Sequence, residues 1–271
     1  MKLELSLLFD NLVDFKMNKH QLTFSATLFV AFSSMAETAI SDISLYKDNY
    51  ILPLYHEENT NQNRYASTNP NGGDAKPTFT QFQFSIKYPL IEQSNAALYV
   101  AYTQKSNWDT YGDSAYFRDN DYNPEIFYEI HQDNSLKFSF GLEHQSNGEG
   151  GENEVSWNRA YAKANYKFHS IDLFIKPWVR IPDKKDYNPD IVKYLGYGEF
   201  GFNYRPKGSE GLNMKLLTRN IFRHEYYAIS ASYPMYKDFR YYIKLESGYG
   251  SSISNYNHRD TSYGVGISLG L

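Results

Sequence analysis

The chain has 271 residues, no cysteine, and a formal net charge of −4 from 27 basic and 31 acidic side chains. Without cysteine it can form no disulfide framework, no thiolate metal site and no cysteine nucleophile. The mildly acidic total, with no basic cluster, lacks the electrostatic signature of a nucleic-acid-binding protein, so we expect no nucleic-acid partner. The mean hydropathy is −0.61, yet the chain contains 26 Tyr and 18 Phe. Low mean hydropathy with many aromatic residues is typical of an all-β membrane barrel.

The first 36 residues have the features of an export signal. From Met17 the sequence reads MNKH, then the apolar run LTFSATLFVAF, then SSMA, with Ser34 and Ala36 at the positions that a signal peptidase recognises. Met17 is the better translation start, because residues 1–16 carry acidic side chains where a signal carries positive charge. The alternative is an amphipathic helix that belongs to the fold. We expect residues 1–36 to be a signal peptide and residues 37–271 to be exported.

The exported part begins with a polar stretch near 57–77 that predicts a loop or a periplasmic segment, because it is rich in Asn and contains Gly and Pro. Beyond it, apolar and polar residues alternate with a period of two, which places successive side chains on opposite faces of a strand. The C-terminal segment shows this most clearly, with large apolar residues separated by Gly or Ser. Roughly twelve such segments can be counted: 46–55, 79–90, 95–106, 124–132, 136–146, 156–168, 171–181, 195–205, 211–220, 224–233, 239–249 and 261–271.

These segments predict a membrane barrel rather than a soluble β-sandwich. Most are close to the ~9–11 residues that a tilted strand needs to cross hydrocarbon. A sandwich would show the same alternation, but the export signal, the segment lengths and the Tyr and Phe content favour the barrel. An even number of antiparallel strands can close, and closure pairs every backbone group that would otherwise face lipid. The sequence therefore predicts an all-β fold: a transmembrane antiparallel β-barrel of about twelve strands in the outer membrane of a Gram-negative bacterium.

Three polar residues interrupt the lipid-facing side of this predicted wall. His144 and Ser146 follow an apolar row on one face of the segment 136–146, and Asn158 faces the same way on the next segment. A serine hydroxyl becomes an effective nucleophile when a neighbouring base takes its proton. Histidine suits that task near neutral pH, and Asn or Asp can hold the imidazole in the useful tautomer. His-x-Ser alone is a weak signal, and the outward position of all three residues leaves two interpretations open, an esterase site and a polar strand end that enters a loop.

Four segments in the same order resemble the outer-membrane phospholipase A family. They are 102–106 (Tyr-Thr-Gln-Lys-Ser), 117–124 (Phe-Arg-Asp-Asn-Asp-Tyr-Asn-Pro), 144–148 (His-Gln-Ser-Asn-Gly) and 156–159 (Ser-Trp-Asn-Arg). The resemblance implies a twelve-stranded barrel that hydrolyses phospholipid acyl esters at either position, and lysophospholipids, as a calcium-dependent homodimer. By residue match, Ser146 would be the nucleophile, His144 the general base and Asn158 the residue that orients it.

The resemblance also implies calcium ligands, and here the sequence departs from the family. Ser114 matches a family ligand that comes from the partner subunit, and Glu149 matches a ligand that acts through its backbone carbonyl. A third family ligand is a Ser in the same loop, but counting from His144 places Glu154 there. A carboxylate is a good ligand for a hard cation, so we expect a Ca²⁺ site at Ser114, Glu149 and Glu154 with altered affinity.

Other functions are possible for a barrel of this kind. A small outer-membrane porin would use a lumen lined by Arg and Lys to select solutes, and a structural or adhesion barrel would carry long surface loops. A barrel hydrolase that modifies lipid A is the nearest enzymatic alternative. The outward His, Ser and Asn favour an enzyme over a porin, and the four matched segments favour a phospholipase over the lipid A enzyme.

Overall fold

The computed structural model describes residues 42–209 and 211–270. The chain divides into Met1–Ile43 and Ser44–Leu271, and every strand found in the described residues belongs to the second unit. Within the described residues, no helix is long and apolar enough to cross a membrane. The signal peptide predicted at residues 1–36 lies outside the described residues.

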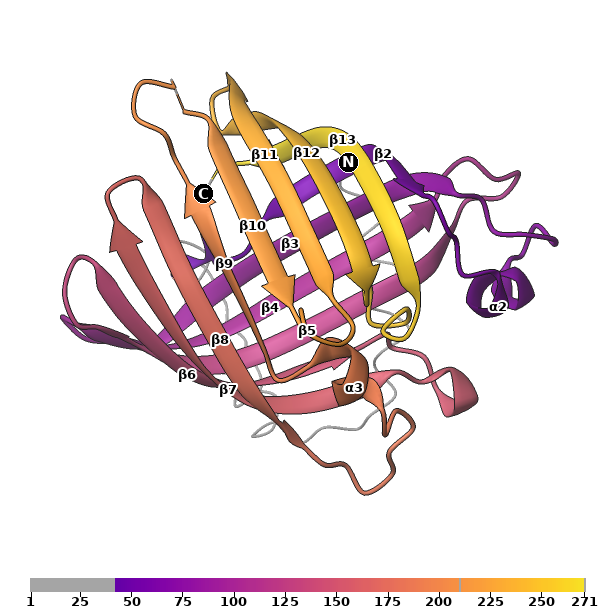
Figure 1. The fold of residues 1–271 in the computed structure, drawn as a ribbon, viewed down its shortest axis with the longest axis horizontal. Coiled ribbons are helices and arrows are strands. Elements are labelled where there is room, and N and C mark those ends of the chain that lie inside the picture. Colours follow the sequence, from indigo (N-terminus) through magenta and orange to yellow (C-terminus); the bar gives the residue numbers. More distant parts are fainter. Residues whose placement is uncertain (1–41, 210, 271) are drawn as a thin grey trace, which may run out of the picture. The chain divides into compact units, whose positions relative to one another are not determined.

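A single antiparallel sheet of twelve strands, β2 to β13, closes on itself, because each strand pairs with its neighbours in sequence and β13 pairs with β2 (Figure 1). The fold predicted from the sequence is confirmed. A short additional strand, β1 (Ser44–Leu45), pairs with β3 beyond the end of β2. The barrel strands are β2 (Asn49–Glu57), β3 (Thr78–Glu92), β4 (Ala96–Asp109), β5 (Tyr116–His131), β6 (Leu136–Ser146), β7 (Ser156–Phe168), β8 (Ile171–Ile181), β9 (Gly198–Tyr204), β10 (Asn213–Arg219), β11 (Tyr226–Tyr236), β12 (Phe239–Tyr249) and β13 (Arg259–Leu269).

Apolar side chains point outward from the barrel and polar ones point inward. On β6, Phe140 and Leu142 are 51% and 52% exposed, whereas Ser139 and Glu143 on either side of this pair are 4% and 3% exposed. This pattern suits a wall that faces hydrocarbon and encloses a polar interior. The same outward apolar face continues around the barrel at Leu54, Phe84, Val100, Ile126, Ile175, Phe200, Ile229, Ile243 and Val265.

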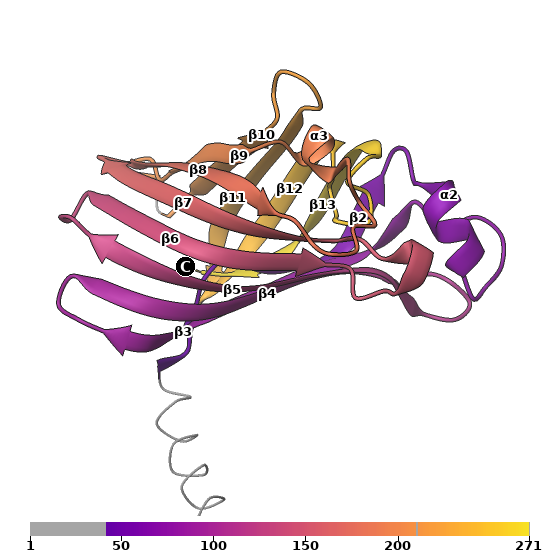
Figure 2. The ribbon, with the colours of Figure 1, turned by 90° about the horizontal axis from the view of Figure 1, so that it is seen from below.

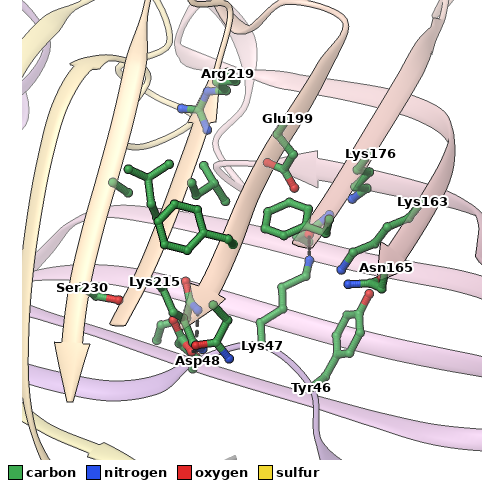
Figure 3. A pocket seen from close by; sticks show the side chains of 18 of the residues that line it. Tyr46, Lys47, Asp48, Lys163, Asn165, Lys176, Glu199, Lys215, Arg219 and Ser230 are labelled. Atoms are coloured by element: carbon green, nitrogen blue, oxygen red, sulfur yellow. Dashed lines mark hydrogen bonds and ion pairs between the residues drawn. The ribbon is translucent and has the colours of Figure 1, made fainter. Parts of the chain in front are cut away.

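The interior is held by buried ion pairs. Glu143 lies between Arg159 and Lys176, at 3.1 and 3.0 Å, so one carboxylate joins β6, β7 and β8. Lys47 reaches Glu125 on β5 at 2.7 Å. Removing these charges from water costs free energy that is offset only when each has an opposite charge and hydrogen bonds. A cavity of about 870 Å³ remains inside the barrel, and Figure 3 shows lysines from several strands that point into it.

The two ends of the barrel differ in their connections. One end has the long segments 58–77, 110–115, 147–155, 182–197, 220–225 and 250–258, and the other has short turns such as 169–170 and 237–238. The long segments contain the short helices α2 (Gln62–Tyr65), η1 (Ala66–Thr68), η2 (Gly151–Asn153) and α3 (Ile191–Leu195), and Figure 2 shows α2 and α3 at one end. In outer-membrane barrels the longer loops are extracellular and the short turns periplasmic.

Strand β5 differs from the sequence prediction. It begins at Tyr116, whereas the alternation predicted a strand over 124–132. The part of β5 that the sequence prediction left out, residues 116–123, contains the polar run Arg-Asp-Asn-Asp, which is typical of a loop in a soluble protein. Asp119, Asp121 and Asn123 instead occupy successive inward positions, 3%, 7% and 8% exposed, where the polar interior accepts them. The register with β4 shifts by one residue at Arg118, a bulge that turns Arg118 inward as well.

Arg118 is therefore expected to contribute strongly to stability. Its buried guanidinium pairs with Glu57 at 2.6 Å, donates to the Lys76 carbonyl at 2.6 Å and stacks on Phe79. Arg118→Ala leaves a buried carboxylate without its partner, and we expect the free energy of unfolding to fall by about 3 kcal/mol or more. Denaturant titration of the barrel in vesicles, followed by tryptophan fluorescence, measures this change.

The matched control is Arg205→Ala, because Arg205 forms an ion pair with Asp172 that is exposed to solvent. Exposed pairs contribute little, so the loss should stay below about 1 kcal/mol. Equal losses in the two variants would contradict the assigned role of the buried pair.

Candidate active site

His144 and Asn158 face each other across neighbouring strands. They are paired residues in the ladder between β6 and β7, and His144 Nδ1 lies 2.8 Å from Asn158 Oδ1. An amide oxygen only accepts hydrogen bonds, so the imidazole donates its Nδ1–H and keeps the lone pair on Nε2. This is the tautomer that can take a proton from a hydroxyl. The structure thus brings together two of the three residues predicted to be catalytic.

Ser146 lies two residues beyond His144 on the same outward face of β6. It is half-buried, as are His144 and Asn158, and it pairs with Ser156 on β7 and Tyr122 on β5. Among the described residues, its hydroxyl has no hydrogen-bond partner, so the contact from Ser146 Oγ to His144 is not formed in this structure. Such contacts are often long without substrate and tighten when substrate binds.

His144 and Ser146 continue the apolar row on the outside of β6, and Asn158 lies beside His144 on β7. Phe140 and Leu142 precede His144 on that face, and they are exposed to the region where hydrocarbon would lie. The site is located where β6 and β7 meet the loop 147–155, at the end of the barrel with the long loops. A molecule embedded in a membrane could reach this site along the apolar wall without entering the barrel.

Inward side chains hold the strands at this level. Gln145 donates to both carboxylate oxygens of Asp121 on β5 at 2.9 Å, and it accepts from Trp157 and Arg159 on β7 at 3.0 Å each. Trp157 is fully buried. Gln145 therefore connects three strands directly behind His144 and Ser146. Sequence reasoning placed Gln145 in a motif but assigned it no role, because its partners are known only from the closed barrel.

Asn147 shapes the loop that follows Ser146. Its Oδ1 accepts from the backbone N–H of Glu149 and Val155 at 3.2 and 3.1 Å, and its Nδ2 donates to the Asn153 carbonyl at 2.9 Å and to Ser254 at 3.2 Å. The backbone then turns at Gly148, which has a φ of +73°. Within the described part of the chain, the Gly148 N–H donates to no other group. It is available to a ligand beside Ser146.

The three residues predicted to bind calcium lie in two loops. Ser114, between β4 and β5, is exposed, and its backbone exchanges hydrogen bonds with Asn71 at 2.8 and 3.0 Å. Glu149 pairs with Arg64 at 2.7 Å, and Glu154 accepts from Ser156 at 3.0 Å. No hydrogen bond joins Ser114 to either glutamate in the described ranges, and these ranges contain no group of three or more His, Asp or Glu side chains that could hold a metal.

The loop charges are nevertheless suited to a hard cation. Glu149 and Glu154 supply carboxylate oxygens, which are the ligands that calcium prefers. Partial burial raises the pKa of Glu149, against the opposing effect of the Arg64 guanidinium. One oxygen of Glu154 accepts from Ser156, which leaves the second for another partner. The donor set fits calcium chemically, but a single chain supplies only part of a coordination shell.

The family model described as Phospholipase A1 matches residues 11–269. The chain belongs to the phospholipase A1 family. It is 33% identical to phospholipase A1 of Proteus vulgaris over 236 residues, which cover 83% of this chain and 80% of the relative. It is 32% identical to a putative phospholipase A1 of Neisseria meningitidis over 248 residues, covering 80% of this chain but only 63% of that relative's length.

Solved structures of the family have the same fold. An active-site mutant of outer membrane phospholipase A from Escherichia coli, in which an asparagine is replaced by alanine, matches with a TM-score of 0.76 and 27% identity over 84% of this chain and 91% of that one. A calcium-bound dimer of the Salmonella typhi outer membrane phospholipase matches with a TM-score of 0.76 and 29% identity over 84% and 92%. The predicted family, the enzyme class and the outer-membrane location are confirmed.

Gly148 is expected to be required for the shape of the active-site loop. A β-carbon at this position would lie 2.5 Å from the Tyr122 ring, and the positive φ is strained for any other residue. Gly148→Ala should therefore destabilise the loop 147–155 by about 1–3 kcal/mol. Amide hydrogen exchange of this loop in detergent measures the change.

Gly150→Ala provides the control in the same loop. Gly150 has a φ of −118°, and a β-carbon there would meet no atom within 4 Å. Amide hydrogen exchange of the loop 147–155 in Gly150→Ala should therefore match that of the unchanged chain. Equal exchange in all three proteins would show that the loop tolerates a side chain at Gly148.

Proposed function

We propose that this chain hydrolyses the acyl esters of phospholipids in the outer membrane, with Ser146 as nucleophile, His144 as general base and Asn158 as the residue that orients the base. The observation that carries the proposal is the hydrogen bond between His144 and Asn158 on an outward, lipid-facing wall. An asparagine also belongs to the active site of the Escherichia coli relative. The long loops at this end of the barrel indicate that the site reaches the outer leaflet.

The proton follows a direct path in the proposed reaction. His144 Nε2 takes the proton from Ser146 Oγ as the oxygen attacks the ester carbonyl carbon. The imidazolium returns this proton to the departing lipid oxygen, which leaves an acyl group on Ser146. Water then attacks the acyl carbon, His144 takes the water's proton, and Ser146 regains it as the fatty acid leaves. Asn158 keeps Nδ1 protonated throughout, so Nε2 remains the reactive nitrogen.

Backbone groups beside Ser146 can stabilise the negative oxygen that forms in this reaction. The free Gly148 N–H and the N–H of Ser146 are the candidate donors. Preorganised donors of this kind lower the barrier of acyl transfer, because they are already oriented toward the charge that develops. The fixed turn at Gly148 provides this orientation.

Calcium and a second subunit would complete the site. We infer that the Glu149 carbonyl, the Glu154 carboxylate and the partner subunit's Ser114 hold the ion, because the donors of one chain are too few. The relative from Salmonella typhi is a dimer with bound calcium. Bound calcium would polarise the ester carbonyl as a Lewis acid. A second barrel against the outer wall would also shield the acyl chains that lie beside Phe140 and Leu142.

The porin alternative is not favoured by the barrel interior. The segment 46–48 crosses the lumen, because Lys47 is paired with Glu125 on β5 while Asp48 is paired with Lys215 on β10. Figure 3 shows this segment in the cavity, with Lys47 and Asp48 extended toward different strands. A segment tied to two distant strands obstructs a continuous channel.

Replacing the proposed catalytic residues gives the first functional test. Ser146→Ala and His144→Ala should each reduce kcat for phospholipid hydrolysis by at least about 10⁴, because each removes a partner in the same proton transfer. Asn158→Ala should leave a measurable rate, since it removes only the orienting group. The measurement is fatty-acid release in mixed micelles, with heat-dependent gel mobility as the control for folding. Full activity in folded Ser146→Ala would end the serine-hydrolase proposal.

Calcium titration tests the proposed metal site and dimer together. Calcium should raise the crosslinked dimer and the activity over one concentration range, because it binds the paired state better than the single barrel. Glu154→Ala should move both curves to roughly tenfold higher calcium, equivalent to about 1.4 kcal/mol of binding free energy.

Glu152→Ala removes a negative charge from the same loop without touching a proposed ligand, and it should leave both midpoints within about twofold of the unchanged chain, or about 0.4 kcal/mol. Turnover without calcium by a species that remains monomeric in sedimentation would contradict the metal and dimer proposal but leave the catalytic residues assigned.

A further inference from the structure

The amide of Asn158 has a second partner, which the sequence analysis did not single out. Its Nδ2 lies 3.0 and 2.8 Å from the two carboxylate oxygens of Asp183. Asp183 is exposed and lies in the segment 182–190, just after β8. A chain of hydrogen bonds therefore runs from Asp183 through Asn158 to His144.

Asp183 determines which way the Asn158 amide is oriented. An asparagine amide can rotate so that either its oxygen or its nitrogen faces the imidazole. With the oxygen toward it, the imidazole is protonated on Nδ1 and Nε2 is a base. With the nitrogen toward it, Nδ1 must accept, the proton moves to Nε2, and the base is lost. A carboxylate only accepts hydrogen bonds, so it holds the NH₂ group on its own side and the oxygen toward His144.

The barrel register places Asp183 where it can do this. Asn158 on β7 is paired with Ile181 on β8, and Ile181 is 39% exposed on the outside of the barrel. Asp183 is two residues further along the chain, so it follows Ile181 on the outward side of the wall.

The loop that carries Asp183 is fastened to the start of β7. Asn188, which is 5% exposed, accepts from the Ser156 N–H at 2.8 Å and donates to the Glu154 carbonyl at 3.1 Å. Arg180 and Asp186 form an ion pair at 2.6 Å across the base of this loop. The carboxylate of Asp183 is thus held beside Asn158 by the fold, rather than meeting it as part of a free loop.

We propose that Asp183 is a positioning residue for the hydrolysis assigned above, and that its carboxylate fixes the orientation of the Asn158 amide and thereby the reactive tautomer of His144. This inference rests on the proposed function, because it concerns the same proton transfer.

The test compares Asp183→Ala and Asp183→Asn with the unchanged chain at saturating calcium. Both variants should lower kcat by about 10- to 100-fold, since an orienting residue contributes less than a base. KM should change by less than about twofold, because Asp183 is hydrogen-bonded to Asn158 and acts on the proton transfer rather than on lipid binding. In an Asn158→Ala background, Asp183→Ala should change kcat by less than about twofold, because the residue through which it acts is gone.

Asp74→Asn is the matched control, because Asp74 is an exposed acid in another loop at the same end of the barrel. It removes the same charge, and kcat should stay within about twofold of the unchanged chain. A loss equal to that of Asp183→Asn would mean that net surface charge, rather than the contact with Asn158, is responsible. This result would overturn the inference.

The tautomer provides a readout that is independent of activity. Nitrogen chemical shifts of ¹⁵N-labelled histidine in detergent should show His144 protonated on Nδ1 in the unchanged chain, and a mixture of both tautomers in Asp183→Ala.

The same tautomer in both proteins, or an unchanged kcat, would overturn the role of Asp183 while leaving Ser146 and His144 assigned. A shift of the calcium curve alone, with an unchanged maximum rate, would make Asp183 a metal ligand instead. Full activity in Ser146→Ala would reject the proposed function itself, and the nitrogen shifts would still test the link from Asp183 to His144.

Discussion

The closed hydrogen-bond network of the barrel is the constraint on which the rest of the structure depends. In hydrocarbon, every backbone N–H and C=O must find a partner within the protein, and twelve strands meet this demand because β13 returns to β2. In a closed sheet, successive side chains of each strand point alternately to the outside and to the inside of the barrel. The apolar outer wall and the paired charges within follow from this alternation.

The candidate active site is an interruption of that pattern. His144, Ser146 and Asn158 occupy outward positions, where the wall otherwise carries apolar side chains such as Leu142. A polar group facing lipid is costly, and it is tolerated here because the site lies at the end of the strands and its imidazole and amide are hydrogen-bonded to each other. If His144 and Ser146 carry out the proposed reaction, this position would bring them to the region where the ester groups of a bilayer lie.

Support for the site comes from the opposite face of the same strands. Gln145 lies between His144 and Ser146 in the sequence but points inward, where it joins β5, β6 and β7. Two residues earlier on the same inward face, the buried carboxylate of Glu143 is paired with Arg159 and Lys176. Alternation thus places a charged, hydrogen-bonded interior directly behind the candidate catalytic residues on the outer wall, and such support would keep these residues in register.

The sequence by itself determined the fold class, the family and the outward row of His144, Ser146 and Asn158, because a period of two and four ordered motifs are local properties of the chain. It did not predict the first half of β5. The polar residues there, such as Asp119 and Asp121, are typical of a loop, and they can occupy a strand only because the closed barrel has a polar interior in which they are buried. It gave no role to Asp183, which is 25 residues from Asn158 along the chain. Such contacts depend on the register between strands and on the path of the loops, and only the tertiary structure decides these, since they arise from the packing of all the strands together.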